Sequence, residues 1–306
     1  MINYTERISL LMRDIVARVP RLSYIDPDEL LVFARYGRRG AAGAVATCHC
    51  ICLPPTEPGH YYWRDRQTGC VTRRSRWFVT KSPLVCLGGR RVQYLISFAL
   101  PRFCDQSLAG SKKAQYYGNA EGWLAKLDTI VHELYHIDPQ APGIRRVERC
   151  DGGAAVGSHG RTFLEQVAEM VKEYLASEPD PACYDFLRDG FAALDGRFDG
   201  VVGTTFRTFP SFPQRYIEFL PSASQPETPA AVRIQALKTP DVPTHYSEHD
   251  LVVRQFLERA TRGVARRDTR REPAALRQIQ LPTGGEIQRA AATQSASAQR
   301  RVKSGA

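Results

Sequence analysis

Two histidines and a glutamate stand in the pattern His132-Glu133-Leu134-Tyr135-His136. Residues four apart lie on the same face of an α-helix, so both imidazoles can bind one metal ion. Glu133 is displaced by about 100° around the helix, which places its carboxylate beside the ion rather than on it. A base in that place can take a proton from water at the metal. The five residues therefore predict a hydrolytic metal site with Glu133 as the general base.

The surrounding residues favour a helix from about 119 to 137. An apolar stripe with helical spacing lies on one side of it, formed by Leu124, Leu127, Ile130, Val131, Leu134 and Ile137. The two histidines and Thr129 fall on the opposite, polar side. Pro139 ends the helix just beyond His136, because proline disfavours helical geometry in the residue before it. The alternative is an amphipathic helix with incidental histidines, which is disfavoured because the chain holds only 7 His.

A zinc ion that activates water is held by three protein ligands and keeps one position open. The longer pattern HExxHxxGxxH is excluded, because Pro139 and Pro142 occupy its glycine and last histidine positions. His159 is the preferred third ligand. Gly157 and Gly160 flank it and allow the backbone to bend towards the metal.

A carboxylate is the alternative third ligand. Glu165 and Glu169 lie four apart on a helix expected over residues 162–176. Thr162 and Glu165 have the spacing of a capping box, which would give Glu165 a structural role instead. The helix itself is predicted from the apolar spacing of Leu164, Val167, Val171 and Tyr174.

The HExxH segment followed by a glycine-rich loop and His159-Gly160-x-x-Phe163 resembles the phage-type zinc metallopeptidases, which are related to the SprT-like and other minimal zincins. Weaker similarity extends upstream, so that the resemblance covers residues 1–176. It implies a zincin-like domain in which three histidines hold zinc (Zn2+), here His132, His136 and His159. The loop of residues 137–158 departs from a compact SprT-like site, and its Glu148 and Asp151 are further alternative ligands.

Composition favours a protein of the cytoplasm. The chain has 306 residues, of which 43% are hydrophobic, and no apolar run approaches the roughly 20 residues that cross a bilayer. Residues 1–19 alternate charged and apolar side chains as an amphipathic helix does, unlike a signal peptide. The 8 cysteines are expected to be reduced thiols. Cys48, Cys50 and Cys52 alternate and would share one face of a strand.

Positive charge is concentrated near the C-terminal end. The formal net charge is +10, and most of it lies beyond residue 250. A helix is expected from Ser247 to about Arg267. The segment up to 271 carries Arg262, Arg266, Arg267, Arg270 and Arg271. Such a cluster can neutralise nucleic-acid phosphates, although a solvated helix face is the commoner explanation. His245 and His249 also stand four apart, but they lack an acid in the base position and are expected to be incidental.

The expected fold class is α+β, with a small antiparallel or mixed sheet packed against the HExxH helix and flanking helices. Strands are expected at 30–36, 43–53, 77–85 and 91–103. Residues 1–195 form the metallopeptidase domain and 196–246 an extension with strands at 201–208 and 215–220 and a linker at 221–229. A basic helix at 247–271 and a disordered tail at 272–306 complete the division.

The leading functional hypothesis is a zinc metallopeptidase acting on a protein or peptide substrate. The alternative is a non-enzymatic, zinc-stabilised protein associated with nucleic acid, in which a carboxylate such as Glu148 would close the metal site. Hydrolysis of a non-peptide amide shares the same chemistry. An intact base favours an enzyme, because a purely structural zinc has no use for Glu133.

Overall fold

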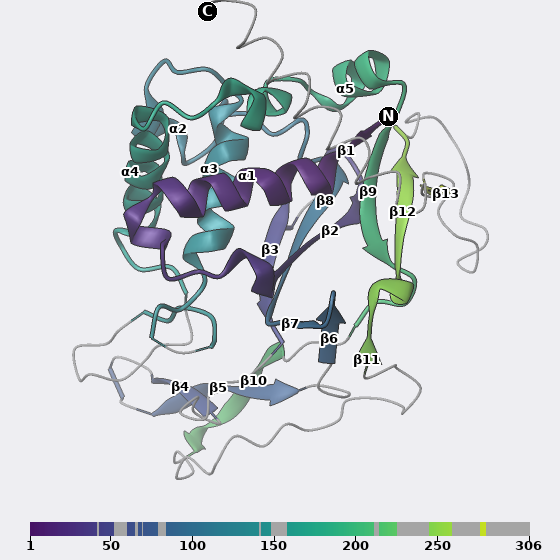
Figure 1. Ribbon diagram of the computed structural model, residues 1–306. Coiled ribbons are helices and arrows are strands. Elements are labelled where there is room, and N and C mark those ends of the chain that lie inside the picture. Colours follow the sequence, from purple (N-terminus) through teal and green to yellow (C-terminus); the bar gives the residue numbers. More distant parts are fainter. Residues whose placement is uncertain are drawn as a thin grey trace, which may run out of the picture.

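The structure is a computed structural model that describes residues 1–41, 43–51, 60–64, 67–68, 70–78, 84–140, 142–147, 158–210, 214–224, 245–258 and 276–279. Within these residues the fold is mixed, with five α-helices and four small sheets (Figure 1). This agrees with the expected α+β class.

The sheet beside the histidine motif has three strands in the order β2-β8-β3. β2 (Leu30–Gly37) runs parallel to β8 (Tyr94–Pro101), whereas β3 (Ala46–Cys50) runs antiparallel to it. Every residue of β8 is buried, as is usual for a central strand covered on both faces. β3 is an end strand, and among the described residues no strand pairs with its outer edge.

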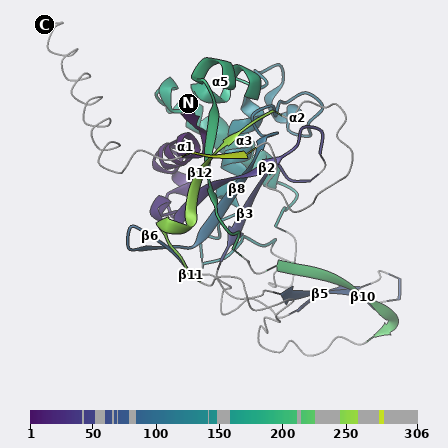
Figure 2. The same cartoon turned by 90° about the vertical axis from the view of Figure 1, so that its right-hand side faces the viewer.

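A four-stranded sheet in the order β1-β9-β12-β13 joins distant parts of the sequence. β1 (Ile2–Asn3) lies parallel to β9 (Val201–Phe206), and β12 (Leu251–Phe256) pairs antiparallel with both β9 and β13 (Leu276–Ile279). Figure 2 shows β12 along the side of the molecule. The other two sheets are formed by β11 (His245–Tyr246), β6 (Leu84–Leu87) and β7 (Arg90–Val92), and by β10 (Gln214–Ser224), β5 (Val71–Phe78) and β4 (His60–Arg64).

The helices gather on one face of the central sheet. α1 (Tyr4–Arg18) crosses in front of the strands, and α3 (Leu124–Tyr135) and α4 (Phe163–Ala176) pack side by side next to it (Figure 1). The remaining helical segments are α2 (Ala114–Tyr117), α5 (Phe191–Phe198) and the short 3-10 helices η1 (Pro20–Leu22), η2 (Pro27–Glu29), η3 (Pro181–Cys183), η4 (Asp185–Leu187) and η5 (Glu248–Asp250).

Both faces of the central sheet are covered by apolar side chains. Val32 of β2 and Ile96 of β8 belong to the large core beneath the helices. Their sequence neighbours Phe33 and Leu95 belong to a smaller core on the other face of the sheet. This is the alternation that a pleated strand imposes. At Gly203 of β9 a Cβ would lie 2.9 Å from the Cβ of Ala34, so glycine permits close packing of β9 on β2.

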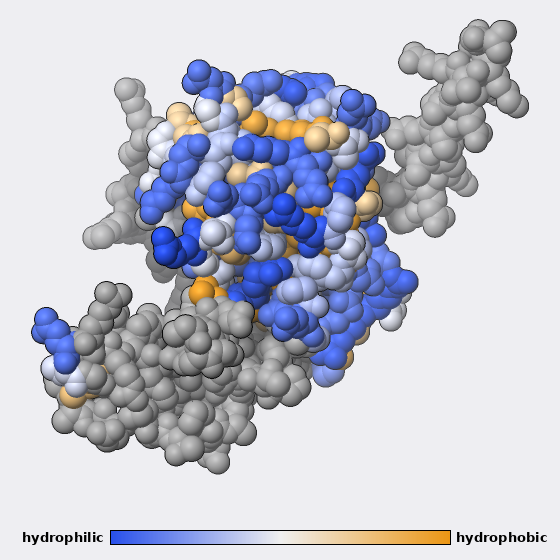
Figure 3. Space-filling model, turned by 90° about the vertical axis from the view of Figure 1, so that its left-hand side faces the viewer, coloured by the Kyte–Doolittle hydropathy of each residue, from blue (hydrophilic) through white to orange (hydrophobic). Residues whose placement is uncertain are grey.

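α4 has the amphipathic character that its sequence predicts. Val167, Val171 and Tyr174 are buried against the core, whereas Glu165 and Glu169 are exposed. The face of the molecule on the side of α4 is mostly hydrophilic, with small apolar patches between the polar groups (Figure 3). The long helix 162–176 is therefore confirmed almost residue for residue.

Several other predicted elements are also confirmed, and three boundaries shift. The N-terminal helix and the strands at 30–36, 201–208 and 215–220 are present as α1, β2, β9 and β10. The motif helix begins at Leu124 rather than near 119. The segment 91–103 forms two strands, β7 and β8, and the strand expected at 43–53 is shorter, as β3. The strand expected at 77–85 was wrong as one element, because Phe78 ends β5 and Leu84 begins β6 in another sheet.

The helix expected from Ser247 was wrong. Only η5 is helical there, and β12 follows at once. Val252 and Val253 are better suited to a strand, since β-branched side chains lose rotamer freedom in a helix. The pairing of β12 with both β9 and β13 therefore outweighs the helical spacing of the apolar residues.

Two predicted segments without regular structure also contain strand residues. β10 extends through Ser224 into the expected linker at 221–229, and β13 lies within the expected disordered tail. The arginine cluster at 262–271 lies outside the described residues, and the domain boundaries at 195 and 246 stay predictions. Among the described residues no helix is both long and apolar enough to cross a membrane.

Candidate metal centre

Three histidine side chains converge at the C-terminal end of α3. His132 lies in the last turn of α3, His136 caps it, and His159 comes from the chain just before α4. The Nε2 atom of His132 lies 3.1 Å from that of His136 and 3.1 Å from that of His159, and the last two are 3.2 Å apart. The structure thus brings together the three ligands expected from the sequence, and the cluster can hold a metal ion.

The separation of the three nitrogens fits a tetrahedral metal. Zn–N bonds of about 2.0–2.1 Å at tetrahedral angles place two ligand nitrogens about 3.3 Å apart. Burial lowers the pKa of His132 to about 2 and that of His136 to about 3, with a smaller contribution from the neighbouring positive groups. Burial also lowers the pKa of His159. Neutral rings present lone pairs to one another, an arrangement that a cation between them stabilises.

The three imidazoles differ in burial. His136 is buried, with 8% of its surface exposed, His132 is partly buried, and His159 is exposed, so solvent reaches the cluster at His159. Among the described residues the cluster contains three side chains that could bind a metal, whereas a structural zinc site is usually closed by four protein ligands.

Phe163 is the common packing partner of the three imidazoles. Its ring centroid lies 5.0 Å from those of His132 and His136 and 4.7 Å from that of His159. The Nδ1 atoms of His132 and His136 are buried without a hydrogen-bond partner in the described part of the chain. In most metal sites that nitrogen donates to a carboxylate or carbonyl, which orients the ring. Here the phenyl ring of Phe163 orients the imidazoles by packing.

Glu133 is buried beside the histidines, with 5% of its surface exposed. Burial raises the pKa of its carboxyl to about 7, against the opposing effects of a hydrogen bond from the Cys48 backbone amide and of the positive charges of Lys113 and Arg35. A base with a pKa near neutrality is well matched to proton transfer at physiological pH. The role of Glu133 as a general base stays a prediction from the motif.

The Lys113 ammonium belongs to a buried polar network on the same side of α3. Its Nζ lies 2.6 Å from Asp128 Oδ1 and donates to Thr129 Oγ1 at 2.6 Å. Asp128 is 1% exposed, and its other carboxylate oxygen accepts from the Tyr117 hydroxyl. The network ties the segment before α3 to the helix one turn ahead of His132. Sequence patterns gave no signal for it, because its members come from unrelated segments.

Arg145 fixes the chain that leaves α3. Its backbone amide donates to the His136 carbonyl at 2.7 Å, and its Nε donates to the Tyr135 carbonyl at 2.9 Å. The guanidinium lies 4.1 Å from the centroid of the Tyr135 ring. A cation bonded to the last carbonyls satisfies the C-terminal end of a helix and holds His136 in place.

The two carboxylate alternatives that the structure describes, Glu165 and Glu169, do not join this cluster. Glu165 is exposed, and Glu169 accepts a hydrogen bond from Arg21 at 2.8 Å on the surface. Glu148 and Asp151 lie outside the described residues. The expected capping box was wrong, since the Thr162 side chain makes no cap hydrogen bond and its backbone is not extended. Gly160 has an ordinary φ and free space around it, so its backbone does not need glycine.

No family model, curated protein or solved structure matches the chain. The site is therefore described by its own chemistry: three convergent imidazoles, of which His159 is exposed, and a buried glutamate directly after the first of them in the sequence. The likeness to SprT-like and related minimal zincins stays an expectation from the sequence motifs.

Proposed function

We propose that the chain is a zinc-dependent peptidase with a zincin-like arrangement. The observation that carries the proposal is the convergence of three Nε2 atoms within 3.2 Å of one another, with the buried Glu133 directly after His132 in the sequence. His132, His136 and His159 would hold the ion. Zinc in such a site supplies a Lewis acid that acidifies water and polarises a carbonyl.

The chain supplies the proton transfers. Glu133 accepts a proton from the attacking water at a carboxylate oxygen and then delivers it to the amine nitrogen of the leaving group. The Cys48 backbone amide, in β3, donates a hydrogen bond to that carboxylate, and the positive charges of Lys113 and Arg35 favour its ionised form. Packing against Phe163 keeps the ligand rings from rotating.

The position of β3 favours a peptide as the substrate. Val45 and Ile51 form backbone hydrogen bonds towards β8, while the Cys48 amide lies towards Glu133. The outer edge of this strand therefore runs past the base, where an extended peptide can pair by its backbone. A small amide would gain nothing from that edge, so a peptide bond is the preferred target.

Zinc content and turnover test the proposal together. We expect one zinc ion per chain by elemental analysis, lost in His132→Ala, His136→Ala and His159→Ala. Glu133→Gln should retain zinc, while hydrolysis of a peptide library falls by about 10²–10⁴-fold because the general base is gone. Glu169→Gln is the matched control, since that carboxylate is paired with Arg21 on the surface.

Either of two results would contradict this function. The first is wild-type turnover in the Glu133→Gln protein, which would remove the proposed base. The second is the absence of bound zinc after reconstitution of the wild-type protein, which would leave the three histidines without their proposed role.

A further inference from the structure

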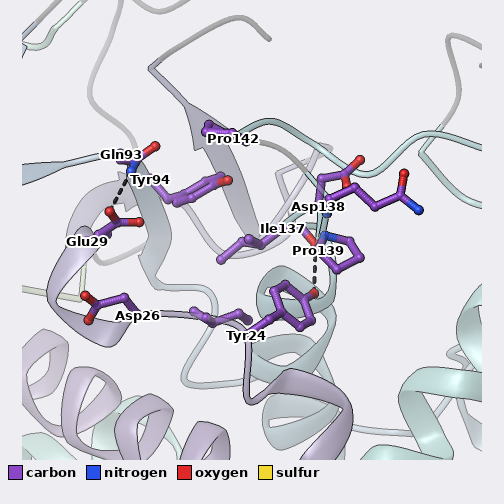
Figure 4. A pocket seen from close by; sticks show the side chains of 11 residues that line it. Tyr24, Asp26, Glu29, Gln93, Tyr94, Ile137, Asp138, Pro139 and Pro142 are labelled. Atoms are coloured by element: carbon purple, nitrogen blue, oxygen red, sulfur yellow. Dashed lines mark hydrogen bonds between the residues drawn. The ribbon is translucent and has the colours of Figure 1, made fainter.

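A cavity of about 230 Å³ lies directly beyond the metal centre, at the C-terminal end of α3. It is bounded by the segment between η1 and β2, the first residue of β8 and the residues that follow His136. In Figure 4, Asp26 and Glu29 lie on one side of it and Asp138 on the other, with Tyr94 and Ile137 between them.

The charged groups that line this cavity are acidic. Asp26, Glu29 and Asp138 line it, and no lysine, arginine or histidine of the described residues does. Each carboxylate accepts one hydrogen bond from an amide N–H, and none forms an ion pair with a described residue. Asp28 in the same loop is different, because it pairs with both Arg13 and Arg90.

The end of α3 adds to this negative potential. The last carbonyls of a helix carry a partial negative charge of about one half, and Ile137 and Asp138 lie just beyond them. A positive charge near the cavity is that of Arg145, whose Nη2 donates to the Tyr24 hydroxyl. Its guanidinium is stacked on Tyr135 and does not line the cavity. A cationic group is therefore the favoured occupant.

The walls between the carboxylates suit a chain of methylene groups that ends in a polar group. Ile25, Tyr94 and Ile137 are at most 5% exposed, and the rings of Pro139 and Pro142 complete the apolar lining. Lysine and arginine combine an aliphatic stem with a charged end in this way.

Tyr94 offers an independent sign of a ligand. Its hydroxyl accepts a hydrogen bond from the Gly143 amide at 3.0 Å, but its own hydrogen has no acceptor among the described residues. Burial raises the pKa of Tyr94, so the hydroxyl stays a donor. A peptide carries carbonyl oxygens that can accept this bond, whereas a bare amine does not.

The cavity is close enough to the metal centre to act on the same substrate. Ile137 follows the ligand His136 directly, and Tyr94 pairs with Cys50 of β3. Cys50 is two residues along the strand from Cys48, whose amide contacts Glu133. Two residues of a strand span about 7 Å, which is also the distance between alternate side chains of an extended peptide.

We propose that this cavity binds a lysine or arginine side chain of the substrate, so that the enzyme selects peptides with a basic residue near the cleaved bond. The inference rests on the proposed peptidase function. The ammonium or guanidinium lies between Glu29 and Asp138, and the stem packs against Tyr94 and Ile137.

Binding without turnover tests this proposal. Two short fluorescent peptides that differ only in lysine or norleucine are titrated into zinc-loaded Glu133→Gln protein, and fluorescence anisotropy is measured. We expect the lysine peptide to bind about tenfold more tightly, the size of a charge-assisted hydrogen bond. The double variant Glu29→Gln/Asp138→Asn should lose most of this preference. Asp28→Asn removes a charge from the same loop without touching the cavity and should retain it.

Equal affinity for the two peptides would overturn the proposal, as would an unchanged preference in a folded double variant. Cadaverine separates a peptide from a free amine as the source of the cation. If cadaverine displaces the lysine peptide at a concentration equal to that of the peptide, the occupant is a free amine and the proposal is overturned. If it does not, the result supports a peptide as the occupant.

Two further results keep the test decisive. If the double variant does not fold, amide chemical shifts of the wild-type protein are recorded with n-butylammonium and with n-butanol. Shifts at Asp138 and Gln140 with the cation alone support the cavity, and identical shifts with both overturn it. A preserved lysine preference in a protein that hydrolyses no peptide would contradict the proposed function and leave the cation site standing.

Discussion

His132 and His136 lie on one turn of a helix, whereas His245 and His249, with the same spacing, lie in β11 and η5. The first pair is joined by His159 and packed around Phe163. The second pair is exposed and lies outside any cluster of metal-ligating side chains that the described residues form. The spacing of two histidines four residues apart is therefore not sufficient to form a metal site. The element that bears the residues, and the third group brought to them, decide whether a site exists.

Removing one ring from each pair should give the largest contrast. We expect His136→Ala to weaken zinc binding by more than about a hundredfold, because it removes a ligand and not merely a group that orients one. His249→Ala should leave the affinity unchanged. Competition with a chromogenic chelator measures both affinities. A similar loss in the two variants would show that the second pair also holds metal.

A smaller effect on zinc affinity is expected from substitution of Phe163, the ring against which His132 and His136 pack. Phe163→Leu should reduce zinc affinity by about tenfold, since the imidazoles lose the surface that orients them. Phe191→Leu, in α5 and equally buried, is the matched control for lost stability alone. The d–d spectrum of the cobalt-substituted protein would report a change in ligand geometry for Phe163→Leu only. Unaltered affinity and spectrum would show that the rings are held by other contacts.

A third contrast between the two pairs concerns the metal-free protein and pH. The pKa values of His132 and His136 are lower in the folded protein than the unfolded value near 6.5. Below pH 6.5 the unfolded chain therefore takes up protons that the folded chain does not, so stability falls as the pH is lowered from 6.5 towards about 3. The slope is at most about 1.4 kcal/mol per pH unit for each ring. Urea unfolding of the metal-free His132→Gln/His136→Gln variant should show a flatter dependence, and His249→Gln an unchanged one.

The three histidines of the cluster were predictable because each lies on or next to a helix with a clear sequence pattern. Helical spacing placed His132 and His136 on one face, and the apolar stripe of α4 located His159 just before its first turn. The groups that tune Glu133 were not predictable. Cys48 acts through its backbone amide, and Lys113 lies in a separate segment of the chain. No sequence motif therefore indicates that either residue affects the pKa of Glu133.

The C-terminal part was mispredicted for a related reason. The apolar residues Val253 and Phe256 fit both a helix and a strand, and only the partner strands β9 and β13 decide between them. Short apolar runs are ambiguous in this way, because the deciding hydrogen bonds come from residues far along the chain.

The parallel pairing of β1 with β9 has a consequence for the order of folding. Ile2 lies beside Val201, and the Thr204 amide donates to Thr5 Oγ1 at 2.8 Å. Closing a loop of about two hundred residues carries a large entropic cost that local contacts do not share. We therefore expect the hairpins and the contact between α3 and α4 to form early, and the start of α1 to dock late. A rapid phase that creates the histidine cluster, followed by a slower one that closes the sheet, is the kinetic signature of this topology.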